Sequence, residues 1–221
     1  MLTFHLAGIN NQNFLMRDDE TGSFWQQITG RAISGPMRGA ALELASTDEV
    51  SFSVFRSEWP QGTVLAPEPR FVKKYASKDW DQHMSKERTV LSFPQSGIAD
   101  RELMLGMTVG DAARAFPLKR VEEERVVQDR VGETPVVLVV GPDGKSVRAF
   151  VSRVRGQETQ FFRSQQGPWS LVDATGASQW DFRGCATSGP AQGTCLEPVG
   201  VVKDYWFDWR NYHPDTTVYR R

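Results

Sequence analysis

Two stretches of the chain repeat one phrase: GRAISGPMRGAALE occupies residues 30–43 and GCATSGPAQGTCLE occupies residues 184–197. They lie 154 residues apart and share eight of their fourteen residues, whereas average residue usage predicts about one chance identity. The same offset matches Phe52 and Phe55 with Trp206 and Trp209 downstream. A duplicated supersecondary unit explains such a pattern, so we predict an internal duplication with an offset of 154 residues.

Upstream of the repeated phrase, both copies carry an Asp-x-Thr-Gly turn signal followed by a tryptophan. The offset of 154 matches Asp19, Thr21 and Gly22 with Asp173, Thr175 and Gly176, and Trp25 matches Trp180 after a slip of one residue.

Each copy is predicted to be mostly β. FWQQITG and SQWDFRG are typical of short strands, and the Gly-Pro pair inside the repeated phrase predicts a tight reversal. SFSVFRSEW and DYWFDWRNY have the aromatic spacing of short amphipathic helices, and final strands follow at residues 63–65 and 217–219. The fold class is therefore mainly β, or α+β with few short helices, in two related β-rich units.

The predicted domains are residues 1–68 as the first unit, residues 69–100 as a polar connection, and residues 101–221 as a second, more complete unit. In the second unit, ELMLGMTV predicts a strand, and GDAARAF predicts a helical turn capped by Asp111 and ended by Pro117. TPVVLVV and SVRAFVSRV predict a hairpin across GPDGK, which is not a phosphate loop because Val139 stands where that motif needs glycine. The first unit lacks an upstream half, so we expect a sheet edge near residues 1–8 that a partner, self-association or a further segment covers.

Cys185 and Cys195 lie symmetrically about Pro190, so a hairpin that reverses there places them opposite one another. Their counterparts in the first copy are Arg31 and Ala41, so both cysteines are present together or absent together. This arrangement predicts a disulfide in an oxidising compartment, and the alternative is a pair of buried free thiols.

Composition excludes several classes of function. The formal net charge is −1, with 26 basic and 27 acidic residues, which disfavours nucleic acid and anionic lipid as partners. No apolar run approaches the roughly 18 residues of a membrane span, and the opening residues do not resemble a signal peptide. We predict no cofactor and no metal.

Two groups of polar residues are candidate sites. Asn13, Asp19, Gln27 and Arg31 surround the first turn and could converge on a small ligand; Gln27 and Arg31 are replaced by Asp181 and Cys185 in the second copy. In an extended backbone, Asp79, Asp81 and His83 would share one face as a metal or general-base cluster, although a solvated loop gives the same residues.

The chain resembles a prokaryotic family known as domain of unknown function 3179. The resemblance covers nearly the whole chain through TFHLAGINNQNFLMRDDETGSFWQQITGRAISGP, KERTVLSFP, VGDAARAFPL, VVQDRVGETPVVLVV and ATGASQWDFRGCATSGP, in this order. The resemblance implies export, but it implies no activity, because the family is uncharacterised. Members usually carry a Cys-Pro-x-Cys-like motif before the TFHLAG-like strand, and no role of that motif is carried over to this chain.

The leading hypothesis is therefore a non-catalytic β-rich binding or assembly module that acts outside the cytoplasm. The alternative is a small hydrolase or sugar-active enzyme that uses the polar cluster of the first copy or the segment with Asp79, Asp81 and His83.

Overall fold

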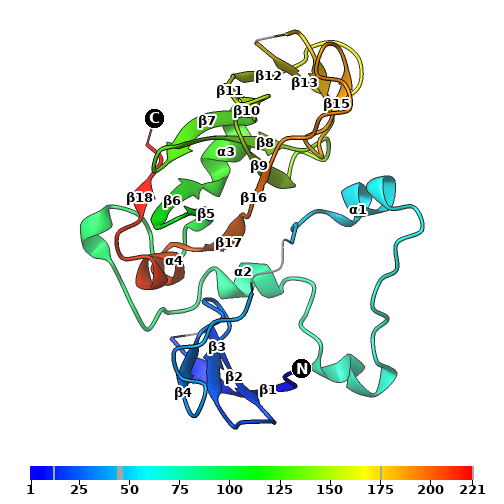
Figure 1. The fold of residues 1–221 in the computed structure, drawn as a ribbon. Coiled ribbons are helices and arrows are strands. Elements are labelled where there is room, and N and C mark those ends of the chain that lie inside the picture. Colours follow the sequence, from blue (N-terminus) through cyan, green and yellow to red (C-terminus); the bar gives the residue numbers. More distant parts are fainter. Residues whose placement is uncertain (12, 44–46, 175, 221) are drawn as a thin grey trace. The chain divides into compact units, whose positions relative to one another are not determined.

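The structure is a computed structural model, and it describes residues 1–11, 13–43, 47–174 and 176–220 (Figure 1). Its secondary structure is mainly β, as predicted. The described chain divides into two compact units. Unit 1 comprises Met1–Thr47, Arg88–Glu102 and Tyr205–Asp215, and unit 2 comprises Asp48–Glu87, Leu103–Asp204 and Thr216–Arg221.

Unit 1 is built on an antiparallel sheet in which each strand pairs with the next along the chain, in the order β1-β2-β3-β4. The first strand, β1, lies at an edge of this sheet, where the sequence predicted one. The elements of unit 1 are β1 (Phe4–Asn10), β2 (Asn13–Asp18), β3 (Phe24–Gln26), β4 (Ala32–Ser34), the 3-10 helix η2 (Pro94–Ser96) and α4 (Trp206–Tyr212).

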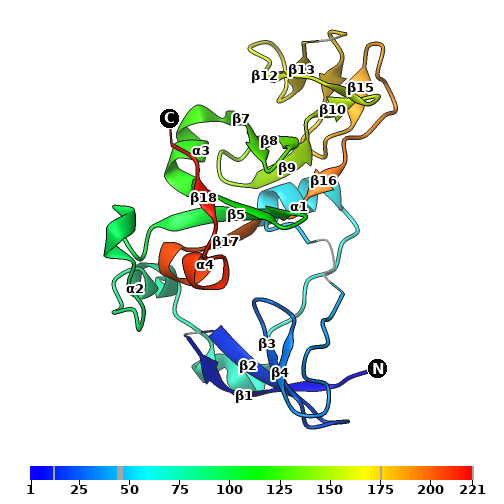
Figure 2. The ribbon, with the colours of Figure 1, turned by 60° about the vertical axis from the view of Figure 1, so that its left-hand side comes forward.

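Unit 2 contains three four-stranded sheets that follow one another as layers (Figures 1 and 2). The first sheet has the order β17-β5-β6-β18, with β17 (Val202–Tyr205), β5 (Leu103–Val109), β6 (Ala112–Pro117) and β18 (Thr217–Val218). The central sheet has the order β16-β9-β8-β7, with β16 (Pro198–Val199), β9 (Val147–Val151), β8 (Thr134–Val140) and β7 (Val126–Val131). The third has the order β12-β13-β14-β15, with β12 (Phe161–Arg163), β13 (Leu171–Asp173), β14 (Gln179–Trp180) and β15 (Ala186–Ser188).

The remaining elements of unit 2 are short. They are α1 (Phe52–Glu58), the 3-10 helix η1 (Pro69–Lys74), α2 (Trp80–Met84), α3 (Leu118–Glu124), β10 (Arg153–Val154) and β11 (Gln157–Glu158). Both helices predicted from the aromatic spacing are present, as α1 and α4.

The run VVLVV in β8 is apolar at every position because the central sheet is buried on both faces. Successive side chains of a strand point to opposite faces. Accordingly Val137 and Val139 belong to one apolar core, shared with β12–β15 and α1, whereas Val136 and Leu138 belong to a second core, shared with β5, β6 and α3. The predicted hairpin across residues 141–145 is confirmed, since β8 pairs antiparallel with β9.

Two sequence predictions were wrong. Residues 112–117 form strand β6 rather than a helical turn, because Gly110, with φ of 57°, and Asp111 form a tight hairpin turn between β5 and β6. Residues 63–65 form no strand, whereas Thr217 and Val218, which the sequence prediction matched with Thr63 and Val64, pair in parallel with β6. Val64 and Leu65 are exposed, because no described strand pairs with them.

Sheets β1–β4 and β12–β15 share more than their strand order. In each, a buried aspartate at the end of the second strand accepts a hydrogen bond from an indole Nε1: Asp18 from Trp25 and Asp173 from Trp180, both at 2.8 Å. In each, a phenylalanine of the first strand meets that indole edge-on: Phe4 at 5.8 Å and Phe161 at 5.6 Å between ring centroids. An isolated antiparallel bridge closes each hairpin, between Arg31 and Ala41 and between Cys185 and Cys195.

Candidate functional site

The aspartates that bind the two indoles hold the turns of the two sheets. Asp18 is fully buried and also accepts hydrogen bonds from the backbone N–H groups of Thr21, at 2.5 Å, and Ser23, at 3.1 Å. Asp173 accepts from the N–H of Gly176 at 2.7 Å. The sequence prediction paired Asp19 with Asp173, but these bonds place Asp18 in the equivalent position; the predicted match of Thr21 with Thr175 lies outside the described residues.

Asp18 is suited to stabilising a turn and not to proton transfer. Burial raises the pKa of its carboxyl, but the hydrogen bonds from Trp25, Thr21 and Ser23 outweigh burial and lower the pKa to about 2. Asp18 is therefore ionised near neutral pH, and its acceptor sites are occupied by the turn.

The predicted polar cluster of the first copy is spread along the sheet. Asn13 begins β2 and Asp19 follows its end, so they are separated by roughly 20 Å of extended chain. The Asn13 amide donates to both carboxylate oxygens of Asp208 in α4 at 2.6 Å. Gln27 and Arg31 are exposed. Among the described residues, no hydrogen bond or ion pair joins any two of Asn13, Asp19, Gln27 and Arg31.

Asp19 has a partner that the sequence analysis missed. Its carboxylate lies 2.9 Å from Nδ1 of His5, and both side chains are about half exposed. The two residues are far apart in the sequence and come together because β1 and β2 pair, with His5 opposite Arg17.

The segment with Asp79, Asp81 and His83 is helical rather than extended, because Trp80–Met84 form α2. His83 Nε2 lies 3.5 Å from Asp79 one turn away, and Asp81 lies on a different side of the helix. In the described part of the chain, no group of three or more His, Cys, Asp or Glu residues is placed to hold a metal ion.

The two cysteines lie where the hairpin prediction placed them. Cys185 and Cys195 face each other in an antiparallel bridge, and their sulfur atoms are 2.01 Å apart, which is disulfide distance.

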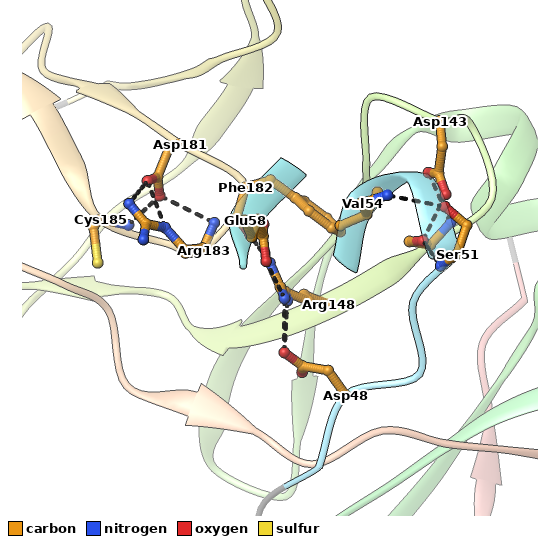
Figure 3. A network of polar contacts seen from close by, with 11 residues as sticks. Asp48, Ser51, Val54, Glu58, Asp143, Arg148, Asp181, Phe182, Arg183 and Cys185 are labelled. Atoms are coloured by element: carbon orange, nitrogen blue, oxygen red, sulfur yellow. Dashed lines mark hydrogen bonds and ion pairs between the residues drawn. The ribbon is translucent and has the colours of Figure 1, made fainter. Parts of the chain in front are cut away.

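A polar network in unit 2 surrounds the buried guanidinium of Arg148 in β9 (Figure 3). Its guanidinium, only 5% exposed, contacts Glu58 at 2.7 and 2.8 Å and Asp48 at 2.8 and 2.9 Å, and donates to the carbonyl of Phe182 at 3.3 Å. The hydrogen bonds to Glu58 and Asp48 raise the pKa of Arg148 although burial lowers it. Every N–H of the guanidinium has an acceptor, so Arg148 holds α1 on β9 and has no donor left for a ligand.

A second set of bonds anchors the start of α1 to the turn after β8 (Figure 3). The Ser51 N–H donates to Ser146 Oγ at 2.9 Å, and the Ser146 hydroxyl donates to Asp143 at 2.6 Å. Burial raises the pKa of Asp143, but bonds from Ser146, Ser51 and Lys145 lower it to about 2. This set of residues is therefore structural.

A polar pocket of about 340 Å³ lies in unit 2 between β7, β8 and the segment after β9. Its charged residues bond to their neighbours: Arg130 contacts Glu158 at 2.5 Å, and Asp129 contacts Arg114 at 2.7 Å. The Gln128 side chain accepts from the Phe161 N–H at 2.9 Å. The lining residues are Gln128, Asp129, Arg130, Pro135, Val136, Ser152, Glu158, Thr159 and Gln160.

Sheet β1–β4 and the segment after it carry exposed apolar side chains, four of which we call the open patch: Leu6, Ile9 and Phe14 in the strands, and Leu42 directly after the Arg31–Ala41 bridge. Leu6 pairs with Met16, Met16 pairs with Trp25, and Ile9 pairs with Phe14. Leu6, Ile9 and Phe14 therefore lie on the face of the sheet that carries the buried indole of Trp25. Phe14 is 48% exposed and Leu42 is 44% exposed, whereas Leu196, at the position equivalent to Leu42, is 5% exposed.

In the second sheet, Trp169 stands at the position equivalent to Phe14, and it is partly buried against the apolar core. Trp169 donates its indole N–H to the carbonyl of Val140 at 3.1 Å and packs edge-on against Phe182 at 5.3 Å. Leu171, equivalent to Met16, is fully buried beside Val137 and Val139 of the central sheet.

None of the helices in the described ranges is both long and apolar enough to cross a membrane. No curated protein of known function and no solved structure matches the chain significantly. The sequence profile of one family, described as a protein of unknown function (DUF3179), matches residues 2–216. That match spans nearly the whole chain and confirms the predicted resemblance, and the chain therefore belongs to the domain of unknown function 3179 family.

Proposed function

We propose that this protein is a non-catalytic β-rich binding or assembly module, built by internal duplication with an offset of 154 residues, whose first copy binds another polypeptide. In this proposal residues 1–68 form the first repeat, residues 69–100 a polar connection and residues 101–221 the second repeat. The repeats differ from the compact units of the fold, since residues 48–68 belong to unit 2 and residues 205–215 to unit 1.

Details of close packing support the duplication. The Ser23 hydroxyl accepts from the N–H of Met37 at 3.0 Å, and the Ser178 hydroxyl accepts from the N–H of Ala191 at 3.0 Å. A Cβ on Gly35 would lie 2.7 Å from Cα of Ser23, and one on Gly189 would lie 2.7 Å from Cα of Ser178. Both glycines also have a positive φ, so the same backbone approach requires glycine in both copies.

The observation that carries the binding role is the open patch. Contiguous exposed apolar surface marks interaction sites more often than isolated exposed residues do. Because Leu42 and Phe14 are exposed where Leu196 and Trp169 pack against the core, the two copies differ in what covers them and not in their own strand order. A surface that packs against a core in one copy and is exposed in the other is suited to binding.

The cysteine pair supports a location outside the cytoplasm. A disulfide between Cys185 and Cys195 would persist in an oxidising compartment and be reduced in a cytosol.

Light scattering of the protein purified gently from its source tests the proposed function. We expect a particle heavier than the 24.9 kDa chain, and we expect Phe14→Ser to reduce its mass to that of the chain. Phe162→Ser is the matched control, because Phe162 is 51% exposed in the second sheet and alternates with the buried Phe161. A wild-type particle of 24.9 kDa would contradict the proposal.

The contact between His5 and Asp19 supports the second candidate, a small hydrolase or sugar-active enzyme. A carboxylate on Nδ1 leaves Nε2 of the imidazole available as a general base. If His5→Ala abolished a measurable turnover while leaving the thermal unfolding temperature unchanged, this candidate would replace the binding module.

A further inference from the structure

The Cys185–Cys195 pair lies on the solvent face of its hairpin. Successive residues of a strand point to opposite faces, and the neighbours Ala186 and Leu196 point into the apolar core, where each is 5% exposed. The two cysteines therefore point away from that core, and Cys195 is exposed while Cys185 is partly buried. A disulfide on the solvent face of a hairpin is open to attack by a dissolved thiol.

Backbone hydrogen bonds close the hairpin on both sides of the cysteine pair. On one side, the Leu196 N–H donates to the Gly184 carbonyl at 2.8 Å. On the other side, the Ala186 N–H donates to the Thr194 carbonyl at 2.8 Å. The cysteines thus form a non-hydrogen-bonded pair of an antiparallel ladder, the kind of pair in which facing side chains come closest.

The first copy forms the same hairpin without cysteines. There the Leu42 N–H donates to the Gly30 carbonyl at 2.9 Å. The Ala32 N–H donates to the Ala40 carbonyl, also at 2.9 Å. The bridge therefore forms without a covalent link between its arms, which indicates that reduction of the cysteine pair leaves the hairpin closed.

Further contacts hold the tip of the cysteine hairpin in place. Ala191 is 3% exposed and belongs to the apolar core, and its N–H donates to the Ser178 hydroxyl at 3.0 Å. The Arg155 side chain donates to the Pro190 carbonyl at 2.6 Å. Two thiols that such contacts hold opposite one another re-form their disulfide readily, because the chain does not have to bring them together first.

We propose that Cys185 and Cys195 form a reversible thiol–disulfide exchange site of the folded protein, and that the reaction partner of this site is a dithiol. The site shares no residue with the open patch and does not depend on what the patch binds.

The exchange transfers two electrons in two steps. A thiolate of the partner attacks the sulfur of Cys195, the more exposed cysteine, and forms a mixed disulfide with it. The bond between the cysteines breaks, and Cys185 leaves as a thiolate that takes a proton from water. The second thiolate of the partner then attacks the partner's sulfur in the mixed disulfide and releases Cys195. The partner becomes a disulfide, and both cysteines become thiols.

Dithiothreitol, a small dithiol, is the probe in the first experiment. The oxidised full chain is mixed with increasing concentrations of dithiothreitol in native buffer, samples are quenched with a maleimide, and the intact mass counts the labelled thiols. We expect the rate of reduction to rise in proportion to the dithiothreitol concentration and to lie within about tenfold of the rate in the urea-denatured chain. A rate that levels off at the slow rate of global unfolding would overturn the proposal, because the pair would then react only in the unfolded protein.

The second measurement determines whether the reduced protein keeps its fold. The Trp180 ring packs edge-on against Phe161 in the sheet that contains the hairpin, so near-ultraviolet circular dichroism reports on this packing. We expect the same near-ultraviolet spectrum for the oxidised chain, the reduced chain and the control variant Cys185→Ala/Cys195→Ala, with a lower Tm for the last two. Loss of this spectrum on reduction would overturn exchange in the folded protein.

Single variants identify the sulfur that is attacked. Cys185→Ser and Cys195→Ser each leave one thiol, and the rate at which glutathione disulfide modifies it, corrected for its thiolate fraction, measures its accessibility. We expect the thiol of Cys195 to react at least about threefold faster than that of Cys185. Equal rates, or a faster reaction of Cys185, would overturn Cys195 as the attacked sulfur.

Reoxidation tests whether the site is reversible. After dithiothreitol is removed, glutathione disulfide should restore a monomeric chain with no free thiol and no bound glutathione. A stable glutathione adduct or a disulfide-linked dimer would overturn the proposal, because the two thiols would then not be held opposite one another.

Discussion

Removing one carboxylate from the Arg148 network should destabilise unit 2 markedly. Glu58→Gln leaves an almost isosteric side chain but replaces one acceptor oxygen with an amide NH2 group, which is a donor and cannot accept a hydrogen bond from the guanidinium. Arg148 is 5% exposed and the Glu58 side chain 13% exposed, so water compensates little for the lost pair. The expected consequence is a looser attachment of α1 to β9.

The magnitude follows from the two partners of Arg148. Removing one member of a buried ion pair costs about 3–5 kcal/mol. Asp48 remains at 2.8 Å from the guanidinium, but it is 49% exposed and hydrated, so it compensates only in part. We expect a loss of about 2–3 kcal/mol, which corresponds to a fall in Tm of roughly 5–10 °C for a protein of this size.

Calorimetry or thermal circular dichroism at neutral pH measures the change in Tm. Glu123→Gln is the matched control, because Glu123 is exposed on α3 and its substitution should change stability by less than about 0.5 kcal/mol. The double variant Glu58→Gln/Arg148→Met should lose less free energy of unfolding than the sum of the losses of the two single variants. The reason is that the double variant leaves no buried arginine charge without its carboxylate. Equal Tm values for Glu58→Gln and Glu123→Gln would refute the network as the attachment of α1.

Three further predictions concern the related sheets. In urea unfolding, Leu196→Ala should lower the free energy of unfolding by about 2–5 kcal/mol, whereas Leu42→Ala, at the equivalent exposed position, should lower it by less than about 1 kcal/mol. Equal losses would contradict the conclusion that Leu196 is buried and Leu42 is not. Because the folded-state pKa of Asp18 is about 2, below its unfolded value, its contribution to stability is present above about pH 4 and is lost as the pH falls toward 2. Asp18→Asn should therefore flatten the dependence of Tm on pH between pH 4 and 2, and an unchanged slope would count against the turn assignment. Replacing Cys185 and Cys195 by alanine should lower the free energy of unfolding by about 2–3 kcal/mol, because the disulfide closes a short loop in the unfolded chain. Under non-reducing conditions, the intact mass of the wild-type chain should be lower by two hydrogen atoms than the mass of the reduced chain. Equal masses would exclude the disulfide.

Local patterns made much of the fold predictable. Periodicity identified α1 and α4, and the apolar run before Gly141 identified the β8–β9 hairpin. Symmetry about Pro190 placed Cys185 opposite Cys195, because a hairpin reverses the chain at a fixed point.

The wrong predictions came from competing local signals. GDAARAF has good helix formers and an aspartate in a capping position, but the Gly110-Asp111 pair makes a two-residue hairpin turn, and pairing with β5 determines the outcome. Residues 63–65 have the composition of a strand, yet a strand needs a partner, and no strand in the described part of the chain pairs with them, whereas β18 pairs with β6.

The buried network was beyond sequence reasoning because its members are far apart along the chain. Asp48 and Glu58 reach Arg148 across 100 and 90 residues. One signal was available: arginine interrupts the apolar strand SVRAFV at a buried position, and a buried arginine requires carboxylate partners. The identity of those partners depends on tertiary packing.

Hydrogen–deuterium exchange of the isolated wild-type chain tests the central claim most directly, namely that two equivalent sheets differ in what covers them. We expect amides of β2 and β3 to exchange at least about tenfold faster than those of β13 and β14, because local opening of a covered sheet costs more. Equal protection of the two sheets, or slower exchange in the first, would contradict the account.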